Sequence, residues 1–204
     1  MDEAPARYLP TDDRKRAIAA AARALIVEKG FEGLRTREIA DRVGINIATL
    51  HYHIPTKDAL IELVARSMRE EFQQQHLNQP RDGLSPEAML LLEIEQFRTN
   101  RRDNPQLIAV MEEMSRRARF DANIARHIMP MRAVWLEHIT RILAAGIADG
   151  TFRGDLEPVA GAYLVIGALI SASSFHLDEA GFDRVVAELL RCLQSNPAKG
   201  KSDD

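Results

Sequence analysis

The sequence has little cysteine and no sign of an export signal. Cys192 is the single cysteine among 204 residues, so the chain cannot close an internal disulfide, and a reducing compartment is the natural environment for it. Acidic side chains interrupt the N-terminal stretch MDEAPARYLPTDDRKR, which lacks the apolar core of a signal peptide. We therefore expect a cytoplasmic protein.

Catalytic motifs are lacking as well. The chain has no H-E-x-x-H, no G-x-x-x-x-G-K-[ST] phosphate loop, no G-x-G-x-x-G and no G-x-S-x-G. The histidines at positions 76, 127, 138 and 176 do not have the spacing of metal ligands. We expect neither an enzyme nor a bound cofactor or metal ion.

Aromatic residues make up only 5% of the chain, while Ala, Leu, Arg and Glu are plentiful, which favours helices over sheet. The formal net charge of −3 excludes a polycation that coats nucleic acid indiscriminately, but it does not exclude a local basic surface. Between residues 35 and 57 the basic residues Arg35, Arg37, Arg42 and Lys57 outnumber Glu38 and Asp41. The composition therefore predicts an all-α protein, with one candidate basic surface.

One uncharged run has the length of a transmembrane helix, namely residues 158–177, PVAGAYLVIGALISASSFHL. Ser171, Ser174 and His176 lie within it, and neither Lys nor Arg stands directly beside it. These features favour a buried helix over a membrane span.

The pattern of residues 33–60 predicts two short helices joined by a tight turn and followed at once by a third. Ala40, Gly44 and Leu50 have the spacing of a helix-turn-helix. In that motif a small residue lies where the helices cross, a glycine makes the turn, and an apolar side chain fills the core. Residues suited to cap helix N-termini stand at the expected starts of the three helices: Thr36, Asn46 and Thr56.

The second of these helices has an outer face with unusual chemistry. At about 100° per residue, Leu50 faces inward and Ala48 and Tyr52 lie opposite, with Thr49 and His51 at the sides. Small, hydroxyl-bearing and imidazole side chains allow a helix to lie in a major groove and to bond base edges or phosphates. An ordinary solvated helix in a bundle could also carry this face.

The run from Gly44 to Leu60, GINIATLHYHIPTKDAL, resembles the DNA-binding segment of the TetR family of bacterial transcriptional regulators, whose usual run is close to G-V-S-x-G-T-L-Y-x-Y-F-x-S-K-E-x-L. The matching positions are Gly44, Thr49, Leu50, Lys57 and Leu60. The departures are Ala48 for glycine, His51 and His53 for tyrosines, and Ile54 for phenylalanine. The resemblance implies a homodimeric regulator, most often a repressor that a small-molecule effector releases from a palindromic operator.

On these grounds we expect the residues that face double-stranded DNA to be Arg35, Thr36, Arg37, Asn46, Ile47, Ala48, Thr49, His51, Tyr52, His53 and Lys57. If His51 and His53 meet phosphates, operator binding should tighten as the pH falls from about 8 to about 6, because histidine titrates near 6.5. The alternative is a half-buried His53 that stays neutral. The departures from the family also leave open a helical small-molecule sensor or interaction protein without specific DNA binding.

The helical pattern divides the chain into three segments. We predict a helix-turn-helix DNA-binding domain over residues 1–57, a helical effector-binding and dimerisation domain over 58–196, and a polar tail over 197–204. A helix over 121–148 is expected to be kinked or broken before Pro130.

Polar groups on apolar helical faces mark candidate effector contacts. A carboxylate, an indole, an imidazole and a phenol near Met and Phe would suit an apolar ligand with a few polar handles. The candidates are Glu93, Phe97, Met111, Trp135, His138 and Tyr163. Alternatively, the same side chains are satisfied residues of the core.

Two helical stripes predict the dimer interface. A seam of mostly small residues recurs at spacings of four and three and would let two backbones approach: Ala160, Leu164, Gly167, Ser171 and Ser174. A second stripe consists of Phe182, Val186, Leu189 and Leu193. With their symmetry mates, these helices would form a four-helix interface. Alternatively both stripes face the core of the chain itself, because patterning does not separate core from interface.

Overall fold

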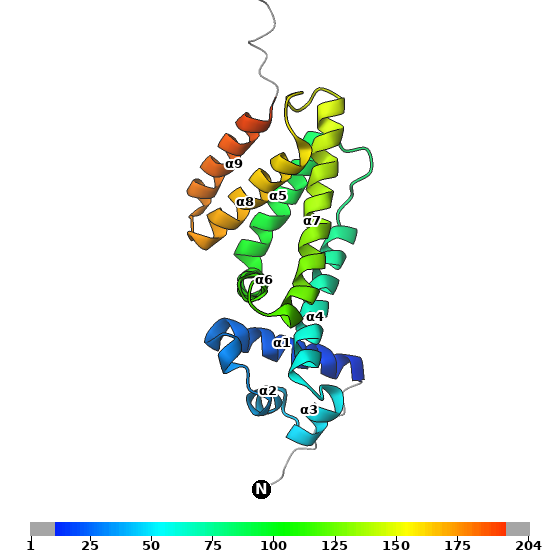
Figure 1. Ribbon diagram of the computed structural model, residues 1–204, viewed down its shortest axis with the longest axis vertical. Coiled ribbons are helices and arrows are strands. Elements are labelled where there is room, and N and C mark those ends of the chain that lie inside the picture. The colour runs from blue at the N-terminus through cyan, green and yellow to red at the C-terminus, as the bar shows by residue number, and fades with distance from the viewer. Residues whose placement is uncertain (1–10, 195–204) are drawn as a thin grey trace, which may run out of the picture. The chain divides into compact units, whose positions relative to one another are not determined.

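The computed structural model describes residues 11–194, which fold into helices joined by turns (Figure 1). This confirms the all-α prediction, whereas the N-terminal arm and the predicted polar tail over 197–204 lie outside the described residues. The helices are α1 (Thr11–Lys29), α2 (Thr36–Val43), α3 (Ile47–His53), α4 (Lys57–Leu77), α5 (Pro86–Asp103), α6 (Pro105–Arg117), α7 (Ala122–Ala148), α8 (Pro158–Ser174) and α9 (Glu179–Leu193), with a 3₁₀ turn at Phe31–Gly33.

Local capping chemistry sets the bounds of the short helices. The side chain of Asn46 accepts a hydrogen bond from the Thr49 amide at 2.7 Å, and Thr56 accepts one from the Ala59 amide at 3.1 Å. Gly44 ends α2 with a φ of 71°, a left-handed conformation that glycine adopts without steric cost. The prediction that Thr36 caps α2 is wrong. Arg35 occupies the cap position without a side-chain bond, and Thr36 is the first helical residue.

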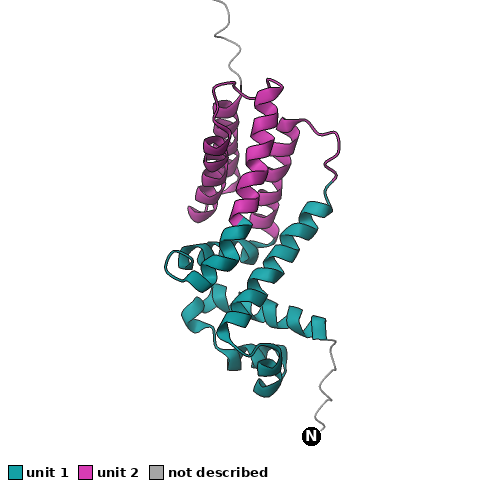
Figure 2. Ribbon diagram, turned by 45° about the vertical axis from the view of Figure 1, so that its right-hand side comes forward, with its two compact units in different colours: residues 1–79, 104–131 teal, residues 80–103, 132–204 magenta. Residues whose placement is uncertain are grey.

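The chain packs as two compact units (Figure 2). The first contains α1 to α4, α6 and the start of α7, with residues up to 79 and 104–131. These units differ from the predicted domains, which divide at residue 57, because α4 and α6 bury their apolar faces against α1. The buried side chains of this core include Ile18, Leu25, Leu50, Val64, Leu107 and Ile128.

The second unit contains α5, the remainder of α7, α8 and α9, with residues 80–103 and those from 132 onward. Its core includes Leu90, Ile139, Phe152, Val165 and Phe182. The expected break before Pro130 does not occur, because α7 continues through this residue from Ala122 to Ala148. Within the described part of the chain, no helix has both the length and the apolar character that a membrane crossing requires.

Candidate nucleic-acid interface

The first unit holds α3 by its inner side only. Leu50 is fully buried and Ile54 is 3% exposed, so both anchor α3 in the core of this unit. The Ile45 amide donates to the Ala40 carbonyl at 3.0 Å and closes the turn between α2 and α3. The side of α3 opposite Leu50 is consequently left to solvent, as the helical projection predicts.

The exposed side of α3 carries most of the residues that we expect to face DNA. Tyr52 is 84% exposed and Ile47 is 37% exposed, while Ala48 and His51 are also exposed. Ile47 and His51 line an open hollow together with residues from the start of α2: Arg35, Thr36, Arg37, Glu38 and Asp41. The fold therefore places the N-terminal end of α2 beside α3, so that both can approach one ligand surface.

The charges near this surface divide into paired and available groups. Arg42 donates to both carboxylate oxygens of Glu28, at 2.8 and 2.6 Å, and to Glu38 at 3.2 Å. The hydrogen bonds with Arg42 hold the pKa of Glu28 below its usual value. Arg42 is one of the basic residues between positions 35 and 57, but Glu28 on α1 and Glu38 on α2 neutralise its charge. Among the described residues, no ion pair engages Arg35, Arg37 or Lys57.

Lys57 occupies an electrostatically unfavourable position for a lysine. It is exposed in the first turn of α4, where the helix dipole disfavours a cation. A phosphate bound there would be attracted both by the N-terminal end of the helix and by the Lys57 ammonium group, and would offset the repulsion between these two. We expect Lys57→Ala to reduce the slope of log affinity against log salt concentration by about one, with a similar loss on every DNA sequence.

The matched control for this titration is Arg42→Ala, which removes a charge that Glu28 and Glu38 already neutralise. Its salt slope should equal that of the unmodified protein. If the slope of Lys57→Ala also stays unchanged within error, Lys57 makes no phosphate contact.

His53 lies at the C-terminal end of α3 in a half-buried position. Its ring meets the ring of Tyr52 edge to face, with centroids 5.2 Å apart and planes at 81°. Burial lowers the pKa of His53, and the nearby positive charges of Arg14 and Lys15 lower it further. The start of α1 thus supplies basic residues next to α3, a feature that the helix-turn-helix pattern does not reveal because these residues precede it by several turns.

The pH dependence of operator binding follows from this environment. A phosphate near His53 raises its pKa, so the complex binds more protons than the free protein between the two pKa values, and affinity rises as the pH falls through them. Since the pKa of His53 in the free protein lies below the ordinary value of 6.5, the increase in operator affinity due to His53 continues below pH 6.5. We expect tighter binding at pH 5.5 than at pH 7.5 at fixed salt. An identical pH profile in His53→Tyr would show that His53 is not a charged contact.

The second unit brings together four of the predicted effector residues. Glu93 on α5 accepts a hydrogen bond from Arg81 at 2.6 Å and lies 3.1 Å from the His138 Nε2 on α7. Burial raises the pKa of Glu93, but hydrogen bonds from His138 and Arg81 outweigh this effect and hold it below its usual value. Phe97 on α5 and Trp135 on α7 stack on each other, with ring centroids 6.1 Å apart and planes at 8°.

We call Glu93, Phe97, Trp135, His138 and Arg81 the polar–aromatic cluster. Sequence reasoning missed Arg81, which belongs to the turn before α5 and carries no helical periodicity. Tyr163 on α8 is 61% exposed, and its contact with an effector stays a prediction. Met111 is half-buried against the core of the first unit.

The two predicted dimer stripes have opposite environments. The α8 seam is exposed throughout, at Ala160, Leu164, Gly167, Ser171 and Ser174, and Val159 and Tyr163 enlarge it. The prediction for the second stripe is wrong. Phe182, Val186, Leu189 and Leu193 are each less than 9% exposed and fill the core of the second unit. Of the two predicted stripes, the one on α8 therefore remains exposed as an apolar face.

A protein-family model matches the helix-turn-helix region. The model of "Bacterial regulatory proteins, tetR family" matches residues 18–64, which contain α2, α3 and most of α1. The HTH-type transcriptional repressor KstR2 of Mycolicibacterium smegmatis is 26% identical over 148 residues, 71% of this chain and 70% of that protein. The tetracycline repressor protein class C of Escherichia coli is 34% identical over 55 residues, 27% of this chain and 25% of that protein.

Solved structures extend the likeness over nearly the whole chain. A TetR family transcriptional regulator from Agrobacterium tumefaciens superposes with a TM-score of 0.78 at 21% identity, covering 91% of this chain and all of that one. AibR, solved with isovaleryl coenzyme A and operator DNA, superposes with a TM-score of 0.72 at 19% identity, covering 89% of this chain and 98% of that one. At such identities the likeness is one of fold.

Proposed function

The chain belongs to the tetR family of bacterial regulatory proteins and is a helix-turn-helix transcriptional regulator, and from this premise we propose that it represses transcription from a palindromic operator until a small molecule binds in its second unit. The family is made up of regulators rather than enzymes. Operator DNA, a small-molecule effector and a second copy of the chain are its partners.

The exposed side of α3 is the observation that carries the proposal. A seven-residue helix gains little stability by itself, and here it is held by Leu50 and Ile54 while its polar and aromatic side faces solvent. Arg35, Arg37 and Lys57 stand around it and are available to phosphates. Such a surface matches the major groove in shape and the duplex backbone in charge.

Dimerisation through α8 would give the DNA complex its symmetry. A two-fold axis at the α8 seam relates the α3 helices of the two chains. These two helices should contact half-sites whose centres are about 34–36 Å apart, or a multiple of that distance. Electrophoretic mobility shift with the DNA that flanks the native gene tests the proposal. We expect one retarded complex that contains two chains. No specific complex with any flanking segment would instead favour a sensor that has lost DNA binding.

The effector should contact the polar–aromatic cluster. A ligand releases DNA only if it binds the DNA-incompetent conformation more tightly than the competent one. Because Trp135 stacks on Phe97, ligand binding at the cluster should change the indole fluorescence, and Trp135 is the single tryptophan of the chain. We expect every compound that releases the operator to change this signal with the same concentration dependence.

The control for the effector test is a variant with Trp135→Phe and Glu93→Ala. It should bind the compound at least about tenfold more weakly, since it loses the larger indole ring with its N–H donor and the carboxylate. A compound that releases DNA from this variant at the original concentration binds elsewhere.

A further inference from the structure

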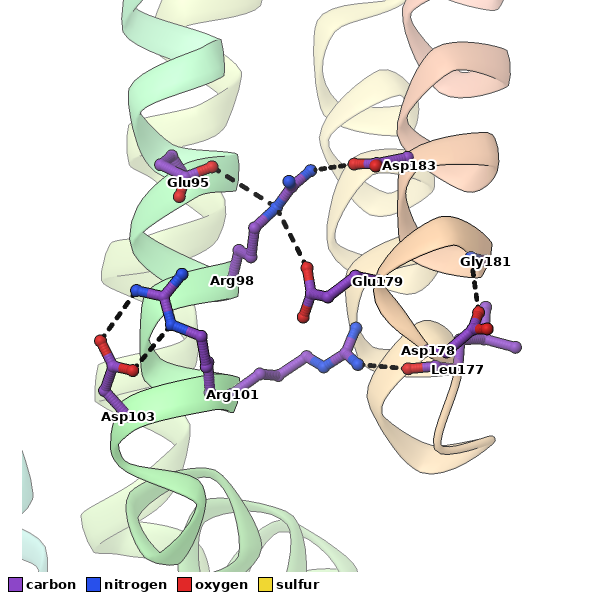
Figure 3. Close-up of polar contacts among 10 residues, drawn as sticks. Glu95, Arg98, Arg101, Asp103, Leu177, Asp178, Glu179, Gly181 and Asp183 are labelled. Atoms are coloured by element: carbon purple, nitrogen blue, oxygen red, sulfur yellow. Dashed lines mark hydrogen bonds and ion pairs between the residues drawn. The ribbon is translucent and has the colours of Figure 1, made fainter.

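Two arginines of α5 hold the beginning of α9 (Figure 3). The guanidinium carbon of Arg98 lies 4.9 Å from the ring centroid of Phe182, and that of Arg101 lies 4.8 Å from it. Phe182 is fully buried, while the Arg98 side chain remains 23% exposed, so its guanidinium covers the ring and still reaches water. The two arginines are three residues apart and therefore project from the same side of α5.

Acidic groups and a backbone carbonyl complete this contact (Figure 3). Arg98 Nη2 donates to Oδ1 of Asp183 at 2.6 Å, in the second turn of α9. Its Nε lies 4.0 Å from Glu179 in the first turn, which is a longer ion pair without a hydrogen bond. Arg101 donates to the carbonyl oxygen of Leu177, in the turn between α8 and α9. We call this arrangement, Arg98 and Arg101 on Leu177, Glu179, Phe182 and Asp183, the arginine dock.

The dock has a consequence for α8 because α8 and α9 pack along one another and share the core of the second unit. Holding the first turn of α9 and the preceding turn fixes the C-terminal end of α8 as well. The exposed seam of α8 extends to Ser174 and Phe175 at this same end, and Phe175 is 78% exposed. The dock thus lies next to the end of the exposed α8 seam, and its acidic members Glu179 and Asp183 are themselves more than half exposed.

We infer that Arg98 and Arg101 are positioning residues for dimerisation, which hold the α8–α9 pair at the angle where two copies of the α8 seam fit together. The inference rests on the proposed function for the dimer itself, and it extends that function to residues outside the seam. Interfaces of packed helices tolerate little rotation, because their side chains interlock at nearly crystalline density.

Analytical ultracentrifugation of a variant with Arg98→Met and Arg101→Met tests the inference. Methionine keeps an unbranched aliphatic stem but removes the cation. We expect the dissociation constant of the dimer to rise about tenfold or more, from the loss of two cation–aromatic contacts and the ion pairs. Binding to the palindrome should weaken, while binding to DNA with a single half-site should not change.

Arg102→Met is the matched control. Arg102 belongs to the same turn of α5, but it bonds the adjacent Asp103, at 2.7 and 2.9 Å. This variant should dimerise and bind the palindrome as the unmodified protein does. An equal weakening in Arg102→Met would overturn the inference, because any loss of charge on α5 would then suffice.

Reversal of the charges separates positioning from general stability. Arg98→Asp alone should weaken the dimer by repulsion from Asp183 and Glu179, and adding Asp183→Arg should restore the dissociation constant to within a few-fold. A loss that the second change leaves unreduced overturns the inference, as does an unaffected dimer in the double Met variant. If the unmodified protein is a monomer, both the proposed function and the inference are overturned. If it is a dimer that binds the palindrome and these substitutions leave the dimer unchanged, only the inference is overturned.

Discussion

Gly167→Leu should abolish the dimer while leaving the monomer folded, and operator affinity should fall by about 10²- to 10⁴-fold because two linked half-site contacts become one. Gly167 is exposed at the centre of the α8 seam, and a Cβ added there lies in open space as far as the described residues are concerned. A leucine therefore meets nothing within its own chain. In a symmetric dimer it would meet its own copy near the two-fold axis and push the two backbones apart.

The stability of the monomer distinguishes a loss of dimerisation from a loss of folding. Replacing glycine within a helix removes backbone freedom from the unfolded chain, so thermal stability of the isolated monomer should stay equal or rise. Sedimentation equilibrium and thermal unfolding measure the two effects separately. Gly146→Ala provides the contrast, because a Cβ at Gly146 would collide with the buried ring of Phe152 and should destabilise the core. An intact dimer in Gly167→Leu would remove α8 from the interface.

Leu50→Ala should destabilise the first unit by about 2–5 kcal/mol, since Leu50 is fully buried and its loss leaves a cavity below α3. Specific DNA binding should disappear with it at temperatures where the variant is still largely helical. Leu50 projects inward from the middle of the short helix α3. Few neighbouring side chains of α3 can therefore move to fill the cavity that its truncation leaves.

Ile47→Ala on the same helix is the control for this measurement. Ile47 is 37% exposed, and its truncation should lower the free energy of unfolding by no more than about 1 kcal/mol. Urea unfolding followed by circular dichroism measures both variants. If Leu50→Ala costs no more than Ile47→Ala, Leu50 does not anchor α3.

Most features that depend on residues a few positions apart were predictable, although the cap at Thr36 and the break before Pro130 were not. The cap of Asn46 on Thr49, the cap of Thr56 on Ala59 and the left-handed Gly44 are each settled within one helical turn. The inward position of Leu50 follows from helical periodicity in the same way. Because the helix-turn-helix is made almost wholly of such local features, its outer face could be predicted from the sequence.

Features that depend on distant partners were not predictable. Arg42 looks like part of a basic surface until Glu28, on another helix, is found beside it. Glu93 and His138 were candidates, but Arg81 joins them only because the turn before α5 passes the same place. Only the tertiary structure therefore shows which cations are without an ion pair among the described residues and which side chains form the polar–aromatic cluster.

The sequence by itself determined most helices of this protein and the exposed face of α3 that we propose for DNA binding, because the capping bonds and the apolar period act over three or four residues. The tertiary structure alone decided which of the two apolar stripes stays exposed, and this is the stripe that we propose for dimerisation. The α8 seam and the stripe from Phe182 to Leu193 have similar helical spacing, yet one is exposed and the other fills the core. Periodicity shows that a helix has an apolar side, but the partner that covers this side comes from other parts of the chain or from another molecule.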